Sequence, residues 1–262
     1  MKKVRNSTVY LTYHELELPG RALCQKEPGY VRYIVNLKNF EHQMDWLRSQ
    51  SWRGVSISEA LSSSNERGVA LTFDDGCETD LLSAAPILKR SSFNATFYIT
   101  VGFLGKPGYM SCGQVRELSD LGFEIASHSM THPYLNDLSD DALQDEIARS
   151  KTELEQIVDR TVAHFSCPGG RWSQRVAKFA KQAGYRSVAT SRAAANSSHS
   201  DPFRLGRVVV MRATDIHTFQ QHCLGRGLWK LQARDLIRST AKSVFGNSSY
   251  DRIRAALLKR CP

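Results

Sequence analysis

The stretch LTFDDGCETD, residues 71–80, places two adjacent aspartates directly after an apolar run. The run itself, residues 69–73, is short and rich in β-branched and aromatic side chains, which predicts a buried strand. Asp74 and Asp75 at the end of this strand repel each other, and a purely structural core has no need of such a pair. A bound divalent cation would neutralise part of that charge, so the motif indicates a metal site.

Strand-like and helix-like stretches alternate along the chain after this motif. Further strands are predicted at 94–100, 123–127, 162–166 and 185–191, and helices at 79–90, 111–121, 139–157 and 173–183. Ser139 can cap the clearest of these helices, since Asp140 and Asp141 follow it in the first turn. The alternation predicts parallel strands with crossover helices, hence an α/β layered fold or barrel. Residues 192–204 are expected to form a loop before a last strand in RLGRVVVM (204–211).

Bulk composition is that of an ordinary globular protein, with 41% hydrophobic and 23% charged residues among 262. We find no apolar run near the roughly 18 residues that a membrane span needs, and no apolar signal segment after the basic start. A cytoplasmic protein is therefore expected, with a peripheral position at the inner membrane surface as a variant. The six cysteines are scattered and form no C-x-x-C pair, so free thiols are expected and a cysteine zinc site has no support from the spacing.

Three predicted strands end in unusual residues: FDDG (73–76), SHSMTH (127–132) and SCPGG (166–170). Ligands bind at the carboxyl ends of the strands in parallel α/β folds. His128 and His132 can reach one point if they flank a tight turn, and two imidazoles with the carboxylate of Asp75 make an open site for zinc or a similar ion. Without the carboxylate, the two histidines could equally be a pair of surface residues with no ligand.

TFDDG followed some fifty residues later by SHSMTH resembles the polysaccharide deacetylase (NodB-homology) family, carbohydrate esterase family 4. The resemblance covers about 66–210 and extends more weakly to the N-terminal VYLTYHEL stretch. It implies a distorted (β/α) barrel and a metal-dependent hydrolase, usually a zinc enzyme, that removes acetyl groups from sugars. Because the motifs match, the resemblance assigns Asp74 as catalytic base and Asp75, His128 and His132 as metal ligands.

The third motif departs from the family pattern. HFSCPGGRW keeps Pro168, but Ser166 stands where the family's arginine is expected and Gly169 replaces an aromatic residue. The backbone N–H of Gly169 remains available as oxyanion donor. Arg171 is the candidate substitute for the arginine that orients Asp74. The missing aromatic wall predicts a pocket that is more open on this side.

The family's general acid is a histidine near the end of the barrel. The sequence alone does not decide which histidine of this chain corresponds to it. His217 follows the last predicted strand, although it fits an exposed helix position equally well. His14 follows a short β-rich run, so it faces either the same mouth or the core. His199 and His222 are weaker candidates.

The basic charge is concentrated at the C-terminus. Residues 225–262 carry a net +7 of the chain's +9, and Lys230, Arg234, Arg238 and Lys242 recur every four residues. We therefore divide the chain into a catalytic domain at 1–224 (core 66–210) and an added basic helical segment at 225–262. These four residues would form a basic stripe along one face of a helix. In one interpretation the apolar face of the helix packs on the barrel and the stripe is only solvated. In the other, the stripe binds anionic membrane lipid or a lipid-linked glycan.

The resemblance implies an enzyme that removes N-acetyl groups from a carbohydrate, in exopolysaccharide or cell-envelope metabolism, with a divalent metal, most simply Zn²⁺. An amidohydrolase of a small non-polymer amide is the first alternative, and a non-catalytic glycan-binding relative is the second. The complete Asp74, Asp75, His128 and His132 set argues against the binding module. No recognised motif supports a nucleic-acid partner.

Overall fold

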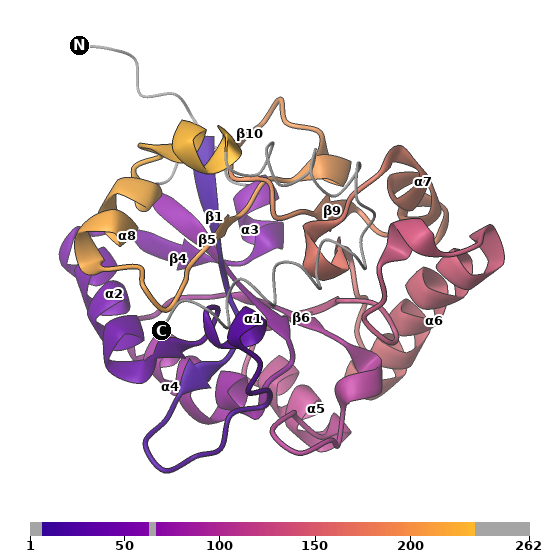
Figure 1. Cartoon of the computed structure of the whole chain (residues 1–262), viewed down its shortest axis with the longest axis horizontal. Coiled ribbons are helices and arrows are strands. Elements are labelled where there is room, and N and C mark those ends of the chain that lie inside the picture. The colour runs from indigo at the N-terminus through magenta and orange to yellow at the C-terminus, as the bar shows by residue number, and fades with distance from the viewer. Residues whose placement is uncertain (1–6, 63–66, 234–262) are drawn as a thin grey trace.

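The computed structural model describes residues 7–62 and 67–233 (Figure 1). A curled nine-stranded sheet lies at its centre, with strands in the order β10-β1-β5-β6-β7-β8-β9, while β4 pairs with β5 and β11 with β1. Every pairing is parallel except that of β1 with β10. The strands are β1 (Ser7–Tyr13), β4 (Arg53–Val55), β5 (Gly68–Asp75), β6 (Thr96–Ile99), β7 (Glu124–Ser127), β8 (His164–Ser166), β9 (Ser187–Ala189), β10 (Ala195–Ser197) and β11 (Val208–Val209).

The sheet curls because the chain after β9 returns to β1. Ala189 at the end of β9 forms a bridge with Leu205, and β11 then pairs with β1 at Leu11 and Thr12. Right-handed crossovers between parallel strands leave all their carboxyl ends at the same edge. The predicted distorted (β/α) barrel is therefore confirmed, and its strand ends converge on one mouth.

Helices surround the strands on the outside (Figure 1). They are α1 (Pro28–Val31), α2 (Leu37–Ser49), α3 (Ile57–Ser62), α4 (Ala85–Arg90), α5 (Cys112–Asp120), α6 (Asp140–Val158), α7 (Gln174–Gln182) and α8 (Ile216–Cys223). A π-helical turn, η1 (Asp80–Ala84), precedes α4, and 3-10 turns follow at η2 (Val101–Phe103), η3 (Leu135–Asp137), η4 (Pro168–Gly170) and η5 (Pro202–Arg204). A small parallel sheet joins β2 (Leu16–Glu17) and β3 (Val35–Asn36).

Side-chain caps start the helices where the sequence predicts them. The Ser139 hydroxyl accepts from the Ala142 N–H at the start of α6. Ser111 and Gln114 form a reciprocal capping box at α5, and Ser173 caps α7. Each cap satisfies a backbone N–H that would otherwise lack a partner, so these helix boundaries follow from local chemistry.

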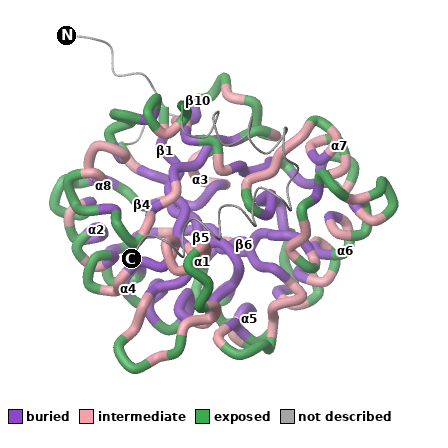
Figure 2. The backbone as a smooth tube through the Cα atoms, viewed as in Figure 1, coloured by how far each residue is buried: buried purple, intermediate pink, exposed green. Residues whose placement is uncertain are grey.

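Stacked aromatic rings hold the central strands in register. Tyr13 of β1 stacks on Phe73 of β5 with ring centroids 5.3 Å apart, and Phe73 stacks on Phe97 of β6 at 4.7 Å. All three are paired neighbours across the sheet and fully buried, and the strands β1, β5 and β6 that carry them are coloured largely as buried in Figure 2. Because Asp74 and Asp75 follow Phe73 directly, this stack also fixes the position of the two carboxylates at the end of β5.

One expectation about the chain is wrong. Residues 195–197 were predicted to belong to a loop, but they form β10, which pairs antiparallel with β1. The side chain of Asn196 exchanges two hydrogen bonds with the backbone of Gly206, both of 2.8 Å, and this tertiary contact holds the strand in place. No local pattern in the polar stretch that surrounds it encodes such a contact.

The C-terminal segment is described in part. Residues 228–233 are helical, and the rest of the predicted basic segment, with Arg234, Arg238 and Lys242, lies outside the described residues. Among the described helices, none has the length and apolar character that crossing a membrane requires.

Candidate active site

Three side chains from two strand ends converge on one point at the mouth of the barrel. Nε2 of His128 and Nε2 of His132 each lie 3.6 Å from Oδ1 of Asp75. Two ligand atoms at about 2.1 Å from one tetrahedral ion lie about 3.4 Å apart, so these separations leave room for a shared ion. Asp75 Oδ1 is buried and has no hydrogen-bond partner among the described residues, which a bound cation would correct. The residues present therefore fit the divalent metal that the sequence implies.

The backbone around these ligands is strained. Asp75, Ser129 and His132 have φ values of 80°, 70° and 63°, a region that non-glycine residues rarely adopt. Gly76 continues the turn with φ 81°, where a side chain would add further strain. Strain of this kind is concentrated at functional sites, where surrounding contacts hold it.

Two contacts hold the histidine loop in this conformation. Glu146 of α6 accepts hydrogen bonds from the backbone N–H groups of Met130 and Thr131. The Ser129 hydroxyl accepts from the N–H of His132 at 3.0 Å. The loop is thereby tied to a long helix, which fixes the second histidine beside the first.

His128 is prepared as a neutral ligand. Its Nδ1 donates to the backbone oxygen of Ser166 at 3.0 Å, which leaves the Nε2 lone pair facing Asp75. Burial lowers the pKa of His128 to about 4, against the opposing effect of Asp74 and Asp75. The imidazole is therefore unprotonated at neutral pH, as metal binding requires.

Asp74 is held by a buried arginine that the sequence analysis did not single out. Nη1 and Nη2 of Arg207 donate to Oδ1 and Oδ2 of Asp74 at 2.7 and 2.8 Å. Burial alone would raise the pKa of Asp74, but the Arg207 charge outweighs it and holds the pKa of that carboxyl well below its usual value. Asp74 is thus an ionised carboxylate in a fixed orientation beside the metal ligands.

The expectation that Arg171 orients Asp74 is wrong, because Arg207 fills that position. Arg207 Nη2 also donates to the Ser166 hydroxyl at 2.7 Å. Ser166 stands where the family pattern expects an arginine, so its small side chain leaves room for the guanidinium of Arg207, which directly precedes β11. The guanidinium of Arg171 instead lies over the ring of Tyr134, 3.4 Å from its centroid.

Gly169 lies at the carboxyl end of β8, inside the turn η4. Its φ of 60° and ψ of 15° belong to the left-handed region, which suits the glycine that replaces an aromatic residue here. The residue is exposed, so the more open pocket that the sequence predicts is compatible with its position. Its role as an oxyanion donor stays a prediction.

The candidate histidines for the general acid lie in different parts of the structure. His217 is exposed in the first turn of α8, on the outside of the barrel, which matches the exposed-helix alternative. His14 directly follows β1, interacts electrostatically with Asp74, and stacks on Tyr33. Its Nδ1 is buried without a hydrogen-bond partner among the described residues. His199 is exposed beyond β10 and His222 lies in α8, so His14 is the histidine that faces the mouth.

A curled, mostly parallel sheet with an ionised aspartate and a candidate Asp–His–His metal site at its mouth is typical of a (β/α)-barrel hydrolase. Comparison with known families agrees, because residues 62–188 match the family model described as polysaccharide deacetylase. This segment of the chain is therefore similar to the polysaccharide deacetylase family, which confirms the resemblance drawn from the sequence motifs.

Individual relatives support the same assignment. The Bacillus subtilis protein YxkH is 29% identical over 182 residues, covering 67% of this chain and 65% of the relative. A peptidoglycan-N-acetylglucosamine deacetylase of Bacillus cereus is 34% identical over 140 residues, 53% of this chain and 60% of the relative. The matched part of the chain thus spans less than two thirds of the length of either relative.

A solved structure shows the same fold. The Streptococcus pyogenes deacetylase PplD, in complex with acetate, superposes with a TM-score of 0.73 at 23% identity. The match covers 83% of this chain and 98% of that protein. At this level of identity the likeness establishes the barrel architecture.

Proposed function

We propose that this chain is a metal-dependent hydrolase that removes N-acetyl groups from a carbohydrate, a polysaccharide or glycan intermediate of exopolysaccharide or cell-envelope metabolism. One observation carries the proposal: three metal-type ligands converge beside a carboxylate that Arg207 keeps ionised. An electrophilic ion beside a base is the combination that metal-assisted hydrolysis of an amide uses.

Asp75, His128 and His132 would hold the divalent ion, with Zn²⁺ as the first choice for a mixed nitrogen and oxygen ligand set. When bound, such an ion polarises the acyl oxygen and makes a water more acidic. The three side chains leave positions open for water and substrate, which is typical of catalytic sites.

The remaining steps fall to protein groups. Asp74 accepts the proton of the attacking water, and Arg207 orients it for that transfer. His14 donates a proton to the departing amine, a role supported by its position near Asp74 and its unpartnered Nδ1 among the described residues. The backbone N–H of Gly169 stabilises the oxyanion from the other side of the mouth.

The substrate class is supported by the family and by the Bacillus cereus relative, whose name specifies peptidoglycan N-acetylglucosamine. We would measure acetate release by the purified full chain from peptidoglycan fragments, N-acetylglucosamine oligomers and polymers, and a small acylated amine. Acetate release from a glycan that stops on metal removal and returns on metal addition is the expected result.

Two other outcomes would replace the proposal. Turnover of the small acylated amine alone would identify an amidohydrolase of a non-polymer amide. Glycan binding without acetate release, with the metal in place, would identify a binding relative that has retained the fold.

A peripheral position at the inner membrane surface remains a proposal from the charge pattern, because its basic stripe lies mostly outside the described residues. Salt-sensitive cosedimentation with anionic liposomes, reduced in the Arg234→Glu/Arg238→Glu variant, is the expected behaviour. Equal cosedimentation with neutral and anionic liposomes, or none with either, would favour a segment that simply packs on the barrel.

A further inference from the structure

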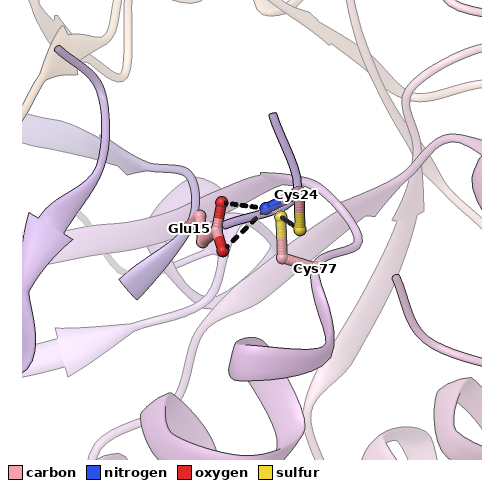
Figure 3. A group of neighbouring side chains, drawn as sticks. All are labelled: Glu15, Cys24 and Cys77. Carbon is pink, nitrogen blue, oxygen red and sulfur yellow. Dashed lines mark hydrogen bonds between the residues drawn. The ribbon is translucent and has the colours of Figure 1, made fainter. Parts of the chain in front are cut away.

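A second cluster of ligand-type side chains lies beside the candidate active site but shares no residue with it. Glu15 follows β1, Cys24 lies between β2 and α1, and Cys77 follows β5 two residues after Asp75 (Figure 3). One carboxylate oxygen and the two sulfur atoms lie within 4.8 Å of one another. Glu15 and Cys77 are buried and Cys24 is half-buried, so the group is largely shielded from water.

The distance between the two sulfurs is informative. Sγ of Cys24 lies 3.7 Å from Sγ of Cys77. A disulfide would bring these atoms to about 2.05 Å. Two thiolates on one tetrahedral zinc, with Zn–S bonds of about 2.3 Å, lie about 3.8 Å apart. The pair is therefore spaced as two ligands of one ion, and it can take up such an ion with little movement.

Glu15 is held ready as the third ligand. Its two oxygens accept the N–H of Cys24 at 3.1 and 3.0 Å, and Oε1 also accepts from Nη1 of Arg21 at 3.0 Å. A carboxylate oxygen has further lone pairs, so Oε2 keeps one for a cation. Two thiolates and one carboxylate around a divalent ion carry a net charge of −1, which the guanidinium of Arg21, shared with Glu78, offsets in part.

Asp80 gives an independent sign of a missing group. Its carboxyl is fully buried, and neither oxygen has a hydrogen-bond partner among the described residues. It interacts electrostatically with Cys24 and Glu15, and also with Asp75 and Asp74 of the active site. A buried carboxyl without a partner calls for an unseen donor or cation. An ion with a water in its fourth position would supply that donor.

We infer that Glu15, Cys24 and Cys77 form a second metal site, for a thiophilic divalent ion of the zinc class. Binding forms two metal–sulfur bonds and releases both thiol protons to solvent, without a change of oxidation state. The ion would tie the segment between β2 and α1 to the turn after Asp75, and so would support the active-site ligands from behind. The inference does not depend on the proposed deacetylase activity.

The sequence pattern gave no sign of this site. Cys24 and Cys77 are 53 residues apart, and neither belongs to a C-x-x-C pair. A C-x-x-C pair reveals only zinc ligands that are close in sequence. Here the barrel brings together the ends of β1 and β5, which are neighbours in the sheet.

Cobalt is a suitable probe, because thiolate ligands give Co²⁺ a strong near-ultraviolet charge-transfer absorption that carboxylate and imidazole ligands do not. The purified full chain would be stripped with a chelator and titrated with Co²⁺. We expect two equivalents to bind and the thiolate band to develop with one of them. The Cys24→Ser/Cys77→Ser variant should lose the band and one equivalent. His128→Ala should keep the band and lose the other equivalent, so the two sites are distinguished.

Cys112→Ser, at an exposed cysteine outside the cluster, is the matched control and should keep the band. If the double variant does not fold, Cys24→Ala at the more exposed thiol should show the same loss. A folded wild-type protein that takes up Co²⁺ without a thiolate band would overturn the inference. Recovery of a Cys24–Cys77 disulfide from protein purified without reductant would overturn it as well.

Discussion

Two buried histidine–carboxylate clusters lie at opposite ends of the same parallel strands. At the amino ends, His164 of β8 lies 3.4 Å from the Glu124 carboxylate of β7, and its ring nitrogens contact the hydroxyls of Ser58 and Ser187, both at 2.8 Å. Thr96 donates to Glu124 as well. At the carboxyl ends, Asp75 keeps an oxygen without any hydrogen-bond partner among the described residues.

The difference shows what separates a structural pair from a functional one. Glu124 and His164 satisfy each other and their neighbours, so the cluster cross-links four strands, β6 to β9, and leaves no valence for a ligand. The Asp75 cluster is incomplete by the same measure. Nε2 of His128 and Nε2 of His132 each lie 3.6 Å from Oδ1 of Asp75, which is too far for a hydrogen bond and leaves room for an ion between them. Residue types are alike at both ends, and only the incomplete cluster can accept an ion.

Asp74→Asn should have the largest effect. The substitution removes the base but leaves the three metal ligands, so acetate release should fall about a hundred- to ten-thousand-fold. Metal content, measured on the same preparation, should stay close to that of wild type. Activity within a few-fold of wild type would remove Asp74 from the role of base.

Exchanging the histidines of the two clusters for alanine should give opposite results. His128→Ala should fold but lose the active-site ion. His164→Ala should keep that ion, and its free energy of unfolding in urea should fall by about 3 kcal/mol, because Glu124 is left buried without its partner. Metal loss in the His164 variant, or full metal content in the His128 variant, would contradict the division between the two ends.

The amino-end cluster should also make stability depend on pH. Burial alone would raise the pKa of Glu124, but the hydrogen bond and charge of His164 outweigh it and lower that pKa from 4.5 to about 2. A depressed carboxyl pKa stabilises the fold above the unfolded value, and this contribution is lost as the pH falls from about 4.5 towards 2.

Between pH 5 and pH 3 the loss from Glu124 alone should be about 2 kcal/mol. Denaturation of Glu124→Gln, which keeps the shape without the charge, should show a shallower decline over this interval than wild type. Parallel curves for the two proteins would mean that the pKa of Glu124 is not lowered in the folded state.

Arg207→Lys should have the smallest of these effects. Lysine keeps the charge but cannot form the paired contact with both oxygens of Asp74, so we expect a loss in kcat/KM of about tenfold. Because lysine makes fewer hydrogen bonds to the Asp74 carboxylate, it lowers the pKa of Asp74 less. The acidic limb of the pH–rate profile should therefore move to higher pH. Arg171→Lys is the matched control, and an equal effect there would show that Arg207 has no special role.

The strand-end ligands could be predicted from sequence because each lies in a compact motif directly after an apolar run. Asp75, His128 and His132 needed only the rule that parallel strands place their carboxyl ends together. The helix caps at Ser111, Ser139 and Ser173 were equally local.

Arg207 could not be predicted in the same way. It lies 133 residues from Asp74 and reaches it only because β11 pairs with β1, beside β5. Arg171 was the nearer arginine in sequence, and proximity in sequence was misleading. Ser166 was the available signal, because a small residue in place of an expected arginine leaves a volume that a side chain from elsewhere in the chain must fill.

The central claim is that the Asp75, His128 and His132 cluster holds the ion on which activity depends. The most direct measurement is acetate release from an N-acetylglucosamine oligomer by chelator-stripped protein, before and after addition of Zn²⁺, for wild type and His128→Ala. The account predicts that Zn²⁺ restores release in wild type and leaves the variant inactive. Undiminished release by stripped wild-type protein, or restoration in His128→Ala equal to that in wild type, would contradict it.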